Sequence, residues 1–429
     1  MKKQVFPILL VNFIGVLGYS IVIPLLIFII TDLGGNGFVY GVLGAMYPLF
    51  QFMGAPILGR MSDTIGRRLV LIISQTGTFI AWVLFVLALL MPKTELWAQQ
   101  TSFTGTYVMT VPLLCVFLAR ILDGFTGGNI SVANAYLSDI STDKDRSANF
   151  AKMATSSSVG LVIGPAVAGI LASTVLGSLL PIMAAAGISL LAIFVISTRL
   201  TDTTSTEVNI GIHSSTIRHF LHLEHKECYQ REEKKSVYPK IGWKSVLSVP
   251  DIPRLYAIYF LTYLAFSLFY SGLPIYASTS LRWTAGDLGI YLALSSLIMV
   301  VVQGPVLNRL NKRFASQTLI ITGALLLSGS FFLLTIENDL GIYGANVLLS
   351  VGNGLMWPSF LSVLAEKGGK KIQGAIQGYG TSMGSLASML GLVAGGVLFE
   401  LFGTLVFFVS AFLFAIVLAL ALRNDLQST

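Results

Sequence analysis

Two oppositely charged side chains stand three residues apart inside one long apolar run. Arg120 and Asp123 lie in the run at about 106–134, among predominantly apolar neighbours. On a helix this spacing places both side chains on one face, where they can pair. A charge inside hydrocarbon costs at least about 2.5 to 3.5 kcal/mol, so charges in a membrane helix are functional candidates. Asp123 is the only carboxylate we place well inside an apolar run, and it is our candidate for carrying a proton, with Arg120 as its partner.

A structural ion pair that only steadies the helix is the alternative interpretation. Counted from Tyr107 at about 1.5 Å per residue, the pair is expected roughly 20 to 24 Å along the helix, past its middle. Burial disfavours a charged Asp123 and the neighbouring Arg120 favours it, so the sequence leaves the protonation state open.

A second group of charges and glycines occupies a short segment between two apolar runs. Residues 59–68 read Gly-Arg-Met-Ser-Asp-Thr-Ile-Gly-Arg-Arg. Glycines permit a tight turn and close helix approach, a carboxylate can meet a helix N-terminus, and arginines pair with carboxylates and lipid phosphates. The residues suited to these roles are Gly59, Asp63, Gly66, Arg67 and Arg68. A merely basic loop would explain the arginines, but not Asp63 or the two glycines.

Asp139 and Arg146 form a further acidic and basic pair after the run at 106–134. A plain solvated loop is the alternative for this pair.

The run at 148–172 contains small residues and a proline, namely Gly160, Gly164, Pro165 and Gly169. Small residues one turn apart permit close helix packing, and proline bends a helix by leaving a carbonyl unpaired.

The composition excludes a water-soluble surface. The chain has 429 residues, of which 54% are hydrophobic and only 11% are charged, roughly half the usual charged fraction. The apolar residues fill runs of about twenty or more, long enough to cross a hydrocarbon core of about 30 Å. Such runs are too long and continuous for membrane strands, so we expect an all-α membrane protein.

Twelve such runs are predicted as membrane helices. They lie at about 5–30, 38–59, 69–91, 106–134, 148–172, 176–198, 255–278, 286–307, 315–335, 341–364, 373–398 and 402–422. With the N-terminus in the cytoplasm, 24 of the 27 Lys and Arg fall on the cytoplasmic side. This positive-inside bias predicts that both termini are cytoplasmic, and it explains the net charge of +7 without nucleic-acid binding.

A long polar segment divides the chain. We predict an N-terminal six-helix bundle at 1–198, a cytoplasmic linker at 199–254 and a C-terminal six-helix bundle at 255–429. A weak internal repeat supports this division, because a shift of 227 residues aligns Gly127, Asp139 and Gly164 with Gly354, Glu366 and Gly391. Parallel repeats of this kind place a substrate site between the halves, near the midplane.

The segment at 59–68 resembles the signature loop of the major facilitator superfamily, with every defining position present. Residues 54–172 are similar to the twelve-span drug:proton antiporters, which include tetracycline and multidrug efflux pumps. The resemblance implies that Asp63, Arg67 and Asp139 form a cytoplasmic gate cluster with Arg146 nearby. It also implies that the antiporter helix motif is made of Gly160, Gly164, Pro165 and Gly169. It also links Arg120 to proton transfer. Ala168 replaces one motif glycine, and Asn12-Phe13-Ile14-Gly15 has no acidic residue where many of these pumps have one.

The predicted function is therefore export of small organic, drug-like or amphipathic compounds in exchange for protons, by alternating access. The alternatives are a proton-coupled or facilitative importer of a small metabolite, and a non-transporting metal or pH sensor. The expected location is a bacterial inner membrane or a plasma membrane, and the expected partners are a small-molecule substrate, protons and the lipid bilayer, with a monomer as the functional unit. Residues proposed to line the cavity by their positions are Asn12, Tyr19, Gln51, Tyr263, Tyr270, Gln303, Asn353 and Trp357.

The linker holds all four histidines of the chain, including His219, His222 and His225, with Cys228 close behind. These residue types bind metals, but on an α-helix each step of three drifts by about 60°, so all of them cannot converge without a bend. We predict no metal site, and a solvated linker is the simpler interpretation. The chain has no glycine loop with a nucleotide-binding lysine, so neither a cofactor nor an enzymatic activity is expected.

Overall fold

The protein is described by a computed structural model that covers residues 2–101, 104–127, 129–141, 145–201, 246–336 and 338–422. Almost all of these residues are helical. The helices before the linker are α1 (Lys2–Val22), α2 (Leu26–Asp32), α3 (Gly37–Ile65), α4 (Arg67–Leu90), α5 (Val111–Gly127), α6 (Asn129–Ile140), α7 (Arg146–Ala172) and α8 (Leu179–Arg199). Those after it are α11 (Ile252–Thr279), α12 (Ala285–Val301), α13 (Leu307–Leu310), α14 (Ser316–Leu333), α15 (Asp339–Phe402) and α16 (Leu405–Ala421).

The predicted all-α membrane fold is confirmed. Eleven helical stretches in the described part of the chain are long and apolar enough to cross a bilayer, and the shorter apolar helix α16 follows them. Together they correspond to the twelve predicted runs. Proline interrupts two of the spans: a 3₁₀ turn at Ile23–Leu25 separates α1 from α2, and a π-helical turn at Val302–Val306 precedes α13. Proline removes a backbone N–H and clashes with the preceding turn, which favours such local changes.

The prediction of helix from residue 106 was wrong. Strand β1 (Glu95–Thr101) pairs antiparallel with β2 (Gly105–Thr110), and α5 begins only at Val111. Thr106, Tyr107 and Val108 are β-branched or aromatic residues that suit an extended chain, and their apolar character extended the predicted run. Arg120 is therefore nine residues into its helix, about 14 Å from the start, rather than about 20 Å.

Helix α15 contains both of the predicted runs at 341–364 and 373–398, without a break in helical structure between them. It nevertheless reverses direction. Trp357 packs edge-on against the ring of Tyr259, and a Cβ at Gly384 would lie 2.7 Å from the same ring. A straight helix would separate Trp357 from Gly384 by about 40 Å. The two parts of α15 therefore cross the molecule in opposite directions.

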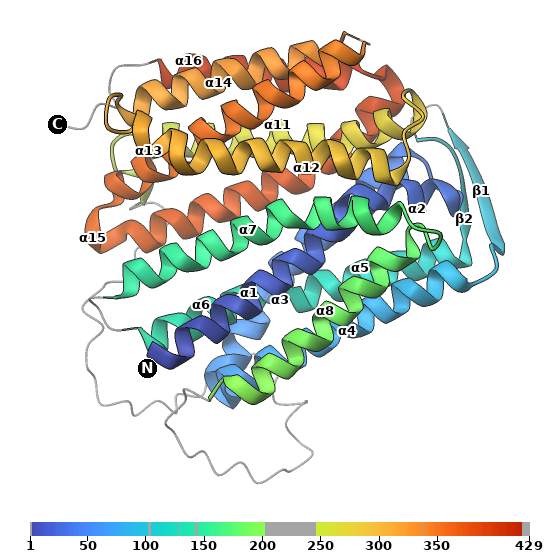
Figure 1. Ribbon diagram of the computed structural model, residues 1–429, viewed down its shortest axis with the longest axis horizontal. Helices are drawn as coiled ribbons and strands as arrows, with labels where there is room; N and C mark the ends of the chain where they lie inside the picture. The colour runs from blue at the N-terminus through green and yellow to red at the C-terminus, as the bar shows by residue number, and fades with distance from the viewer. Residues whose placement is uncertain are drawn as a thin grey trace.

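Figure 1 shows the helices before the linker, in blue to green, on one side of the molecule and those after it, in yellow to red, on the other. The start of α1 and the end of α16 lie at one end, and β1 and β2 lie at the opposite end, which we call the hairpin end. Helix α3 begins at the hairpin end and runs for 29 residues, about 43 Å, toward the termini. Asn36 begins it by accepting a hydrogen bond from the Val39 N–H at 3.1 Å.

Candidate functional site

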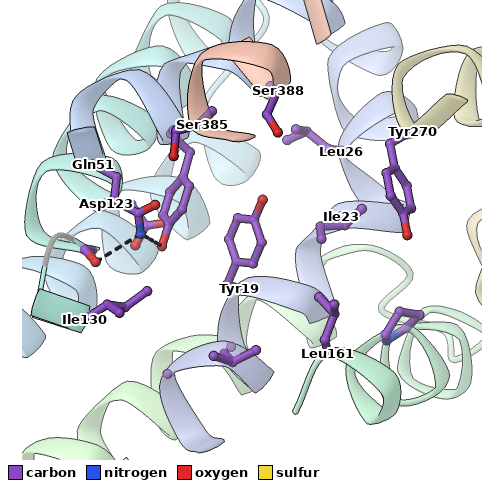
Figure 2. Close-up of a pocket in the computed structure, with 18 of the residues that line it drawn as sticks. Tyr19, Ile23, Leu26, Gln51, Asp123, Ile130, Leu161, Tyr270, Ser385 and Ser388 are labelled. Carbon is purple, nitrogen blue, oxygen red and sulfur yellow. Dashed lines mark hydrogen bonds between the residues drawn. The ribbon is translucent and has the colours of Figure 1, made fainter. Parts of the chain in front are cut away.

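A central cavity of about 520 Å³ lies between the helices before and after the linker. Residues from both groups line it, including Tyr19 and Asp123 from the first and Tyr270 and Ser388 from the second. Figure 2 shows the ring of Tyr19 projecting into the space that Ser385 and Ser388 face. A volume of this size suits a small organic molecule.

The structure brings six of the eight proposed cavity residues to this wall: Asn12, Tyr19, Gln51, Tyr263, Tyr270 and Asn353. It does not place Gln303 or Trp357 among the lining residues. Gln303 belongs to the π-helical turn in the span that begins with α12. Trp357 stacks on Phe360 with ring centroids 5.7 Å apart and contacts the ring of Tyr263 edge-on. It therefore supports the cavity-lining Tyr263 without lining the cavity itself.

Arg120 and Asp123 are buried on the cavity wall, each only 3% exposed. The Nη1 atom of Arg120 lies 3.4 Å from Oδ2 of Asp123, and the guanidinium lies 5.8 Å from the centre of the Trp82 ring. The Nε atom of Arg120 is buried without a hydrogen-bond partner among the described residues. The two residues are thus joined by one long hydrogen bond, and a cation–π contact supports Arg120. In this arrangement Asp123 can bind a proton, and both groups can bind a ligand.

Aromatic and amide side chains surround this pair on the side before the linker. The rings of Tyr19 and Tyr47 are stacked with centroids 4.5 Å apart. Gln51 donates hydrogen bonds from Nε2 to the Tyr47 hydroxyl at 3.2 Å and to the Gly127 carbonyl at 3.1 Å. The stacked tyrosines provide a flat apolar surface with polar edges, which suits planar amphipathic molecules.

The opposite wall is made of uncharged polar groups that sequence reasoning missed. Ser295 and Ser350 line the cavity, and both bond the fully buried Asn346 behind them. Ser295 donates to its side-chain oxygen at 2.6 Å, and Ser350 donates to its backbone carbonyl at 2.8 Å. Further hydroxyls face the cavity from the second part of α15, at Thr381, Ser385 and Ser388. Their spacing of four and then three residues places them on one helix face, a stripe that could have been found in the sequence.

Asn12 lines the cavity but also joins two helices. Its Nδ2 donates to Ser157 Oγ at 2.7 Å and to the Met153 carbonyl at 3.2 Å, both in α7. Ser156 of α7 donates in return to the Leu9 carbonyl at 2.7 Å. The side-chain amide of Asn12 is therefore engaged in packing α1 against α7.

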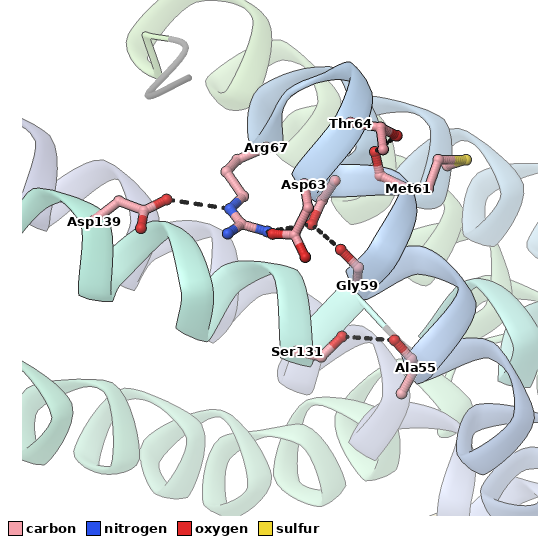
Figure 3. Close-up of polar contacts among 9 residues, drawn as sticks. Ala55, Gly59, Met61, Asp63, Thr64, Arg67, Ser131 and Asp139 are labelled. Atoms are coloured by element: carbon pink, nitrogen blue, oxygen red, sulfur yellow. Dashed lines mark hydrogen bonds and ion pairs between the residues drawn. The ribbon is translucent and has the colours of Figure 1, made fainter. Parts of the chain in front are cut away.

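The charged segment at 59–68 lies at the end of α3 that is away from the hairpin and includes the start of α4. Arg67 stands between two carboxylates, with Nη1 2.5 Å from Asp63 Oδ1 and Nε 3.1 Å from Asp139 Oδ2, as Figure 3 shows. The Arg67 side chain is only 14% exposed, whereas Asp63 is 60% exposed. Ser62 donates to the Gly59 carbonyl at 2.7 Å and holds the last turns of α3.

Gly66 has φ of 100° and forms the corner between α3 and α4, a conformation that favours glycine. Two residues later, Arg68 donates a hydrogen bond to the Ser197 carbonyl at 2.5 Å and so connects this corner to α8. Arg146 begins α7, and its side chain lies outside the described part of the structure, as do most side chains of residues 365–377.

The small residues of α7 contact two different partners. A Cβ at Gly160 would lie 2.9 Å from the Phe13 carbonyl, and one at Gly164 would overlap Ser20, so both glycines pack against α1. Gly169 instead faces α12, where its added Cβ would lie 3.0 Å from the Gly289 backbone. The same helix thus packs within its own half through two glycines and against the other half through the third.

The linker histidines His219, His222 and His225, with Cys228, lie outside the described residues. Within the described ranges no cluster of three or more His, Cys, Asp or Glu is placed to hold a metal ion.

Sequence comparison identifies the family. The model for the Major Facilitator Superfamily matches residues 8–392, with a second match at 255–427. Tetracycline resistance protein, class C, of Escherichia coli is 25% identical over 378 residues, covering 87% of this chain and 84% of the relative. Multidrug resistance protein 1 of Bacillus subtilis (strain 168) is 26% identical over 428 residues, covering 98% and 96%.

Two solved structures share the fold. The human organic anion transporter MFSD10 (TETRAN) superposes with a TM-score of 0.63 at 19% identity, covering 98% of this chain and 99% of that one. A D-xylose-proton symporter superposes with a TM-score of 0.71 at 13% identity, covering 98% of both chains. With its apolar helices, its central cavity and the family match over most of its length, the chain belongs to the Major Facilitator Superfamily of multi-pass membrane transporters.

Proposed function

We propose that this transporter exports small amphipathic organic compounds in exchange for protons, with Asp123 as the coupling carboxylate. The observation that carries the proposal is the buried Arg120–Asp123 pair on the wall of a cavity shared by both halves. The resemblance to relatives named for tetracycline and multidrug resistance favours export of drug-like molecules.

The charges of the pair explain how proton and substrate would exclude one another. With Asp123 ionised the pair is neutral, and the carboxylate can attract a cationic or polarised substrate in a site of low dielectric constant. A proton on Asp123 removes that attraction and leaves Arg120 without its counter-charge. Proton binding then weakens substrate binding, and by linkage substrate binding expels the proton.

The two walls of the cavity divide substrate recognition. The stacked Tyr19 and Tyr47 rings would hold the flat face of the substrate, and the hydroxyls of Ser385 and Ser388 would bind its polar edge. We place the loop at 59–68 on the cytoplasmic side, where the Asp63–Arg67–Asp139 cluster acts as a gate that breaks and reforms with each cycle. Both termini lie on that side, and the monomer is the transporting unit.

Proton coupling is tested in liposomes that contain a pH-sensitive dye and no imposed gradient. Adding tetracycline or ethidium should move protons across the membrane. Asp123→Asn should abolish this movement and weaken the binding of ethidium, because it removes the carboxylate that attracts a cation. Asp287→Asn is the matched control, because Asp287 is an exposed acid that caps its own helix. Substrate flux without proton movement would exclude exchange, and uptake coupled to proton entry in the same direction would favour an importer.

Recognition by the hydroxyl wall is tested with Ser388→Ala. Losing one hydrogen bond should weaken binding of tetracycline, which carries several hydroxyl groups, by about fivefold to tenfold. Binding of tetraphenylphosphonium, a cation that has no hydrogen-bonding group, should change little. Ser382→Ala is the control on the same helix, because Ser382 is exposed and its hydroxyl donates to the Gly378 carbonyl. Equal losses for both ligands would reject the assigned role.

A further inference from the structure

Three elements meet at the hairpin end of the molecule. There the first turns of α3 pack against the last turns of α15, and Gly105 at the start of β2 lies against their contact. We call the contact of Gly37 and Gly41 with Gly396 and Glu400 the α3–α15 seam. Because α3 belongs to the first half and α15 to the second, any movement that opens the hairpin end must break this seam.

Glycines allow the two helix backbones to touch. A Cβ at Gly41 would lie 2.6 Å from the Leu392 carbonyl and 3.2 Å from the Gly396 Cα. A Cβ at Gly396 would lie 3.1 Å from the Gly41 Cα. Contacts this close leave no room for a side chain, so the seam has a single packed arrangement.

One charged group closes the seam. The Glu400 carboxylate lies at the N-terminus of α3, where a Cβ on Gly37 would be 3.0 Å from its Oε2, and it faces the Gly37 N–H. A carboxylate at this position interacts favourably with the unpaired N–H groups and positive end of the helix dipole. Hydrogen bonds to an ionised acceptor are roughly twice as strong as neutral ones. The second half thus holds the first by a charge-assisted contact at its edge.

The hairpin is attached to the same point. Asn36, which caps α3, donates from Nδ2 to the Thr104 carbonyl at 2.6 Å and to the Thr106 carbonyl at 3.3 Å. Gly105 between them has φ of +68°, and a Cβ there would overlap the Glu400 carboxylate. Hairpin, cap and carboxylate therefore form one contact group, and the positive φ at Gly105 favours glycine there.

We propose that Glu400, Gly37 and the hairpin tip at Gly105 form a latch that keeps the hairpin end closed. The latch holds while the Glu400 carboxylate bonds the start of α3, and it must release before the cavity can open at this end. The hairpin moves with the first half, to which Asn36 ties it. This proposal concerns the balance between conformations and requires neither proton coupling nor a particular substrate.

The experiment measures access to the cavity from each side of the membrane. Ser388→Cys serves as the reporter in a background with Cys115→Ala and Cys228→Ala, because Ser388 lines the cavity. A membrane-impermeant thiol reagent is applied to vesicles of known sidedness. Thr101→Cys in the exposed strand β1 identifies the vesicles whose hairpin end faces the reagent.

Glu400→Gln should raise the rate of labelling from the hairpin side by about fivefold, and Glu400→Ala should raise it further. Both variants should lower labelling from the opposite side, because opening one end closes the other. Glu400→Asp, which keeps the charge, should restore part of the closed population. Asp287→Asn is the matched control, since it removes an acid from the same end whose carboxylate bonds Thr284 at the start of its own helix.

Two results would overturn the latch. Unchanged labelling in Glu400→Ala would show that the carboxylate does not hold the hairpin end closed. Increased labelling from both sides would show general loosening of the protein instead of a shift between two states. Failure of the proton-exchange experiment would leave this result untouched, so the two proposals can fail separately.

Discussion

Adding one methyl group at Gly289 should shift the transporter away from the state in which the hairpin end is closed. The backbones of α7 and α12 touch at this point: a Cβ at Gly289 would lie 2.7 Å from the Gly169 nitrogen and 3.3 Å from the Pro165 carbonyl. Ordinary contacts require about 3.4 to 4 Å, and a helix backbone cannot rotate away as a flexible side chain can. The two halves must therefore separate to accept alanine.

The size of the effect follows from the cost of overpacking. Inserting a methyl group into a close-packed contact typically costs about 1 to 3 kcal/mol. The higher helix propensity of alanine, about 1 kcal/mol, stabilises both conformations equally and cancels. Only the closed state has the clash, so the equilibrium should shift by about 5-fold to 150-fold toward opening at the hairpin end.

The assay combines thiol labelling of Ser388→Cys with thermal unfolding followed by tryptophan fluorescence. Gly289→Ala should increase labelling from the hairpin side and change the melting temperature little, because the protein can relieve the clash by opening. Gly187→Ala in α8 is the matched control, since nothing lies within 4 Å of its added Cβ. If Gly289→Ala behaved as Gly187→Ala does, the α7–α12 contact would not constrain the closed state.

Three further predictions test the site and its supports. Arg120→Gln should raise KM for cationic dyes only slightly but reduce substrate-driven proton movement at least tenfold, because Asp123 loses its counter-charge. Direct binding measures the first effect, and the flux reported by the pH-sensitive dye measures the second. Arg67→Ala removes both ion pairs of the loop and should slow turnover several-fold at unchanged substrate affinity, whereas Thr64→Ala on the exposed side of the same loop should have no effect. Asn12→Ala removes the hydrogen bonds that the Asn12 side chain donates to α7 and should destabilise the protein by about 1 to 3 kcal/mol, measured as a lower melting temperature than that of Ser382→Ala.

Features that depend on a single continuous stretch of the sequence were the most predictable part of this molecule. Long apolar runs predicted the membrane helices, and the segment at 59–68 predicted the family, because both signals are local and depend on residue type alone. The strands at 95–110 were not predicted, since Tyr107 and Val108 are as apolar as the helix that follows them. Apolar character reports transfer from water and does not by itself distinguish helix from strand.

Contacts between the halves could not be predicted from either half. Gly160, Gly164 and Gly169 form one pattern in the sequence, yet the first two contact α1 and the third contacts α12. The partner of Gly169 is Gly289, more than a hundred residues away, and no local spacing indicates the pairing. Gln303 and Trp357 illustrate the same limit, because position along a span does not fix which face of the helix meets the cavity.

Small residues, rather than charges, make most of the contacts described here between the two halves at the hairpin end. The α3–α15 and α7–α12 contacts both lie toward the hairpin end, and each joins glycines from opposite halves. Backbone contact between glycines has no side-chain entropy to lose and involves no charge to desolvate, so it can form and break at little cost in each cycle. A single carboxylate at the solvent edge then suffices to bias the equilibrium. The opposite end carries the Asp63–Arg67–Asp139 cluster, whose three residues all belong to the first half.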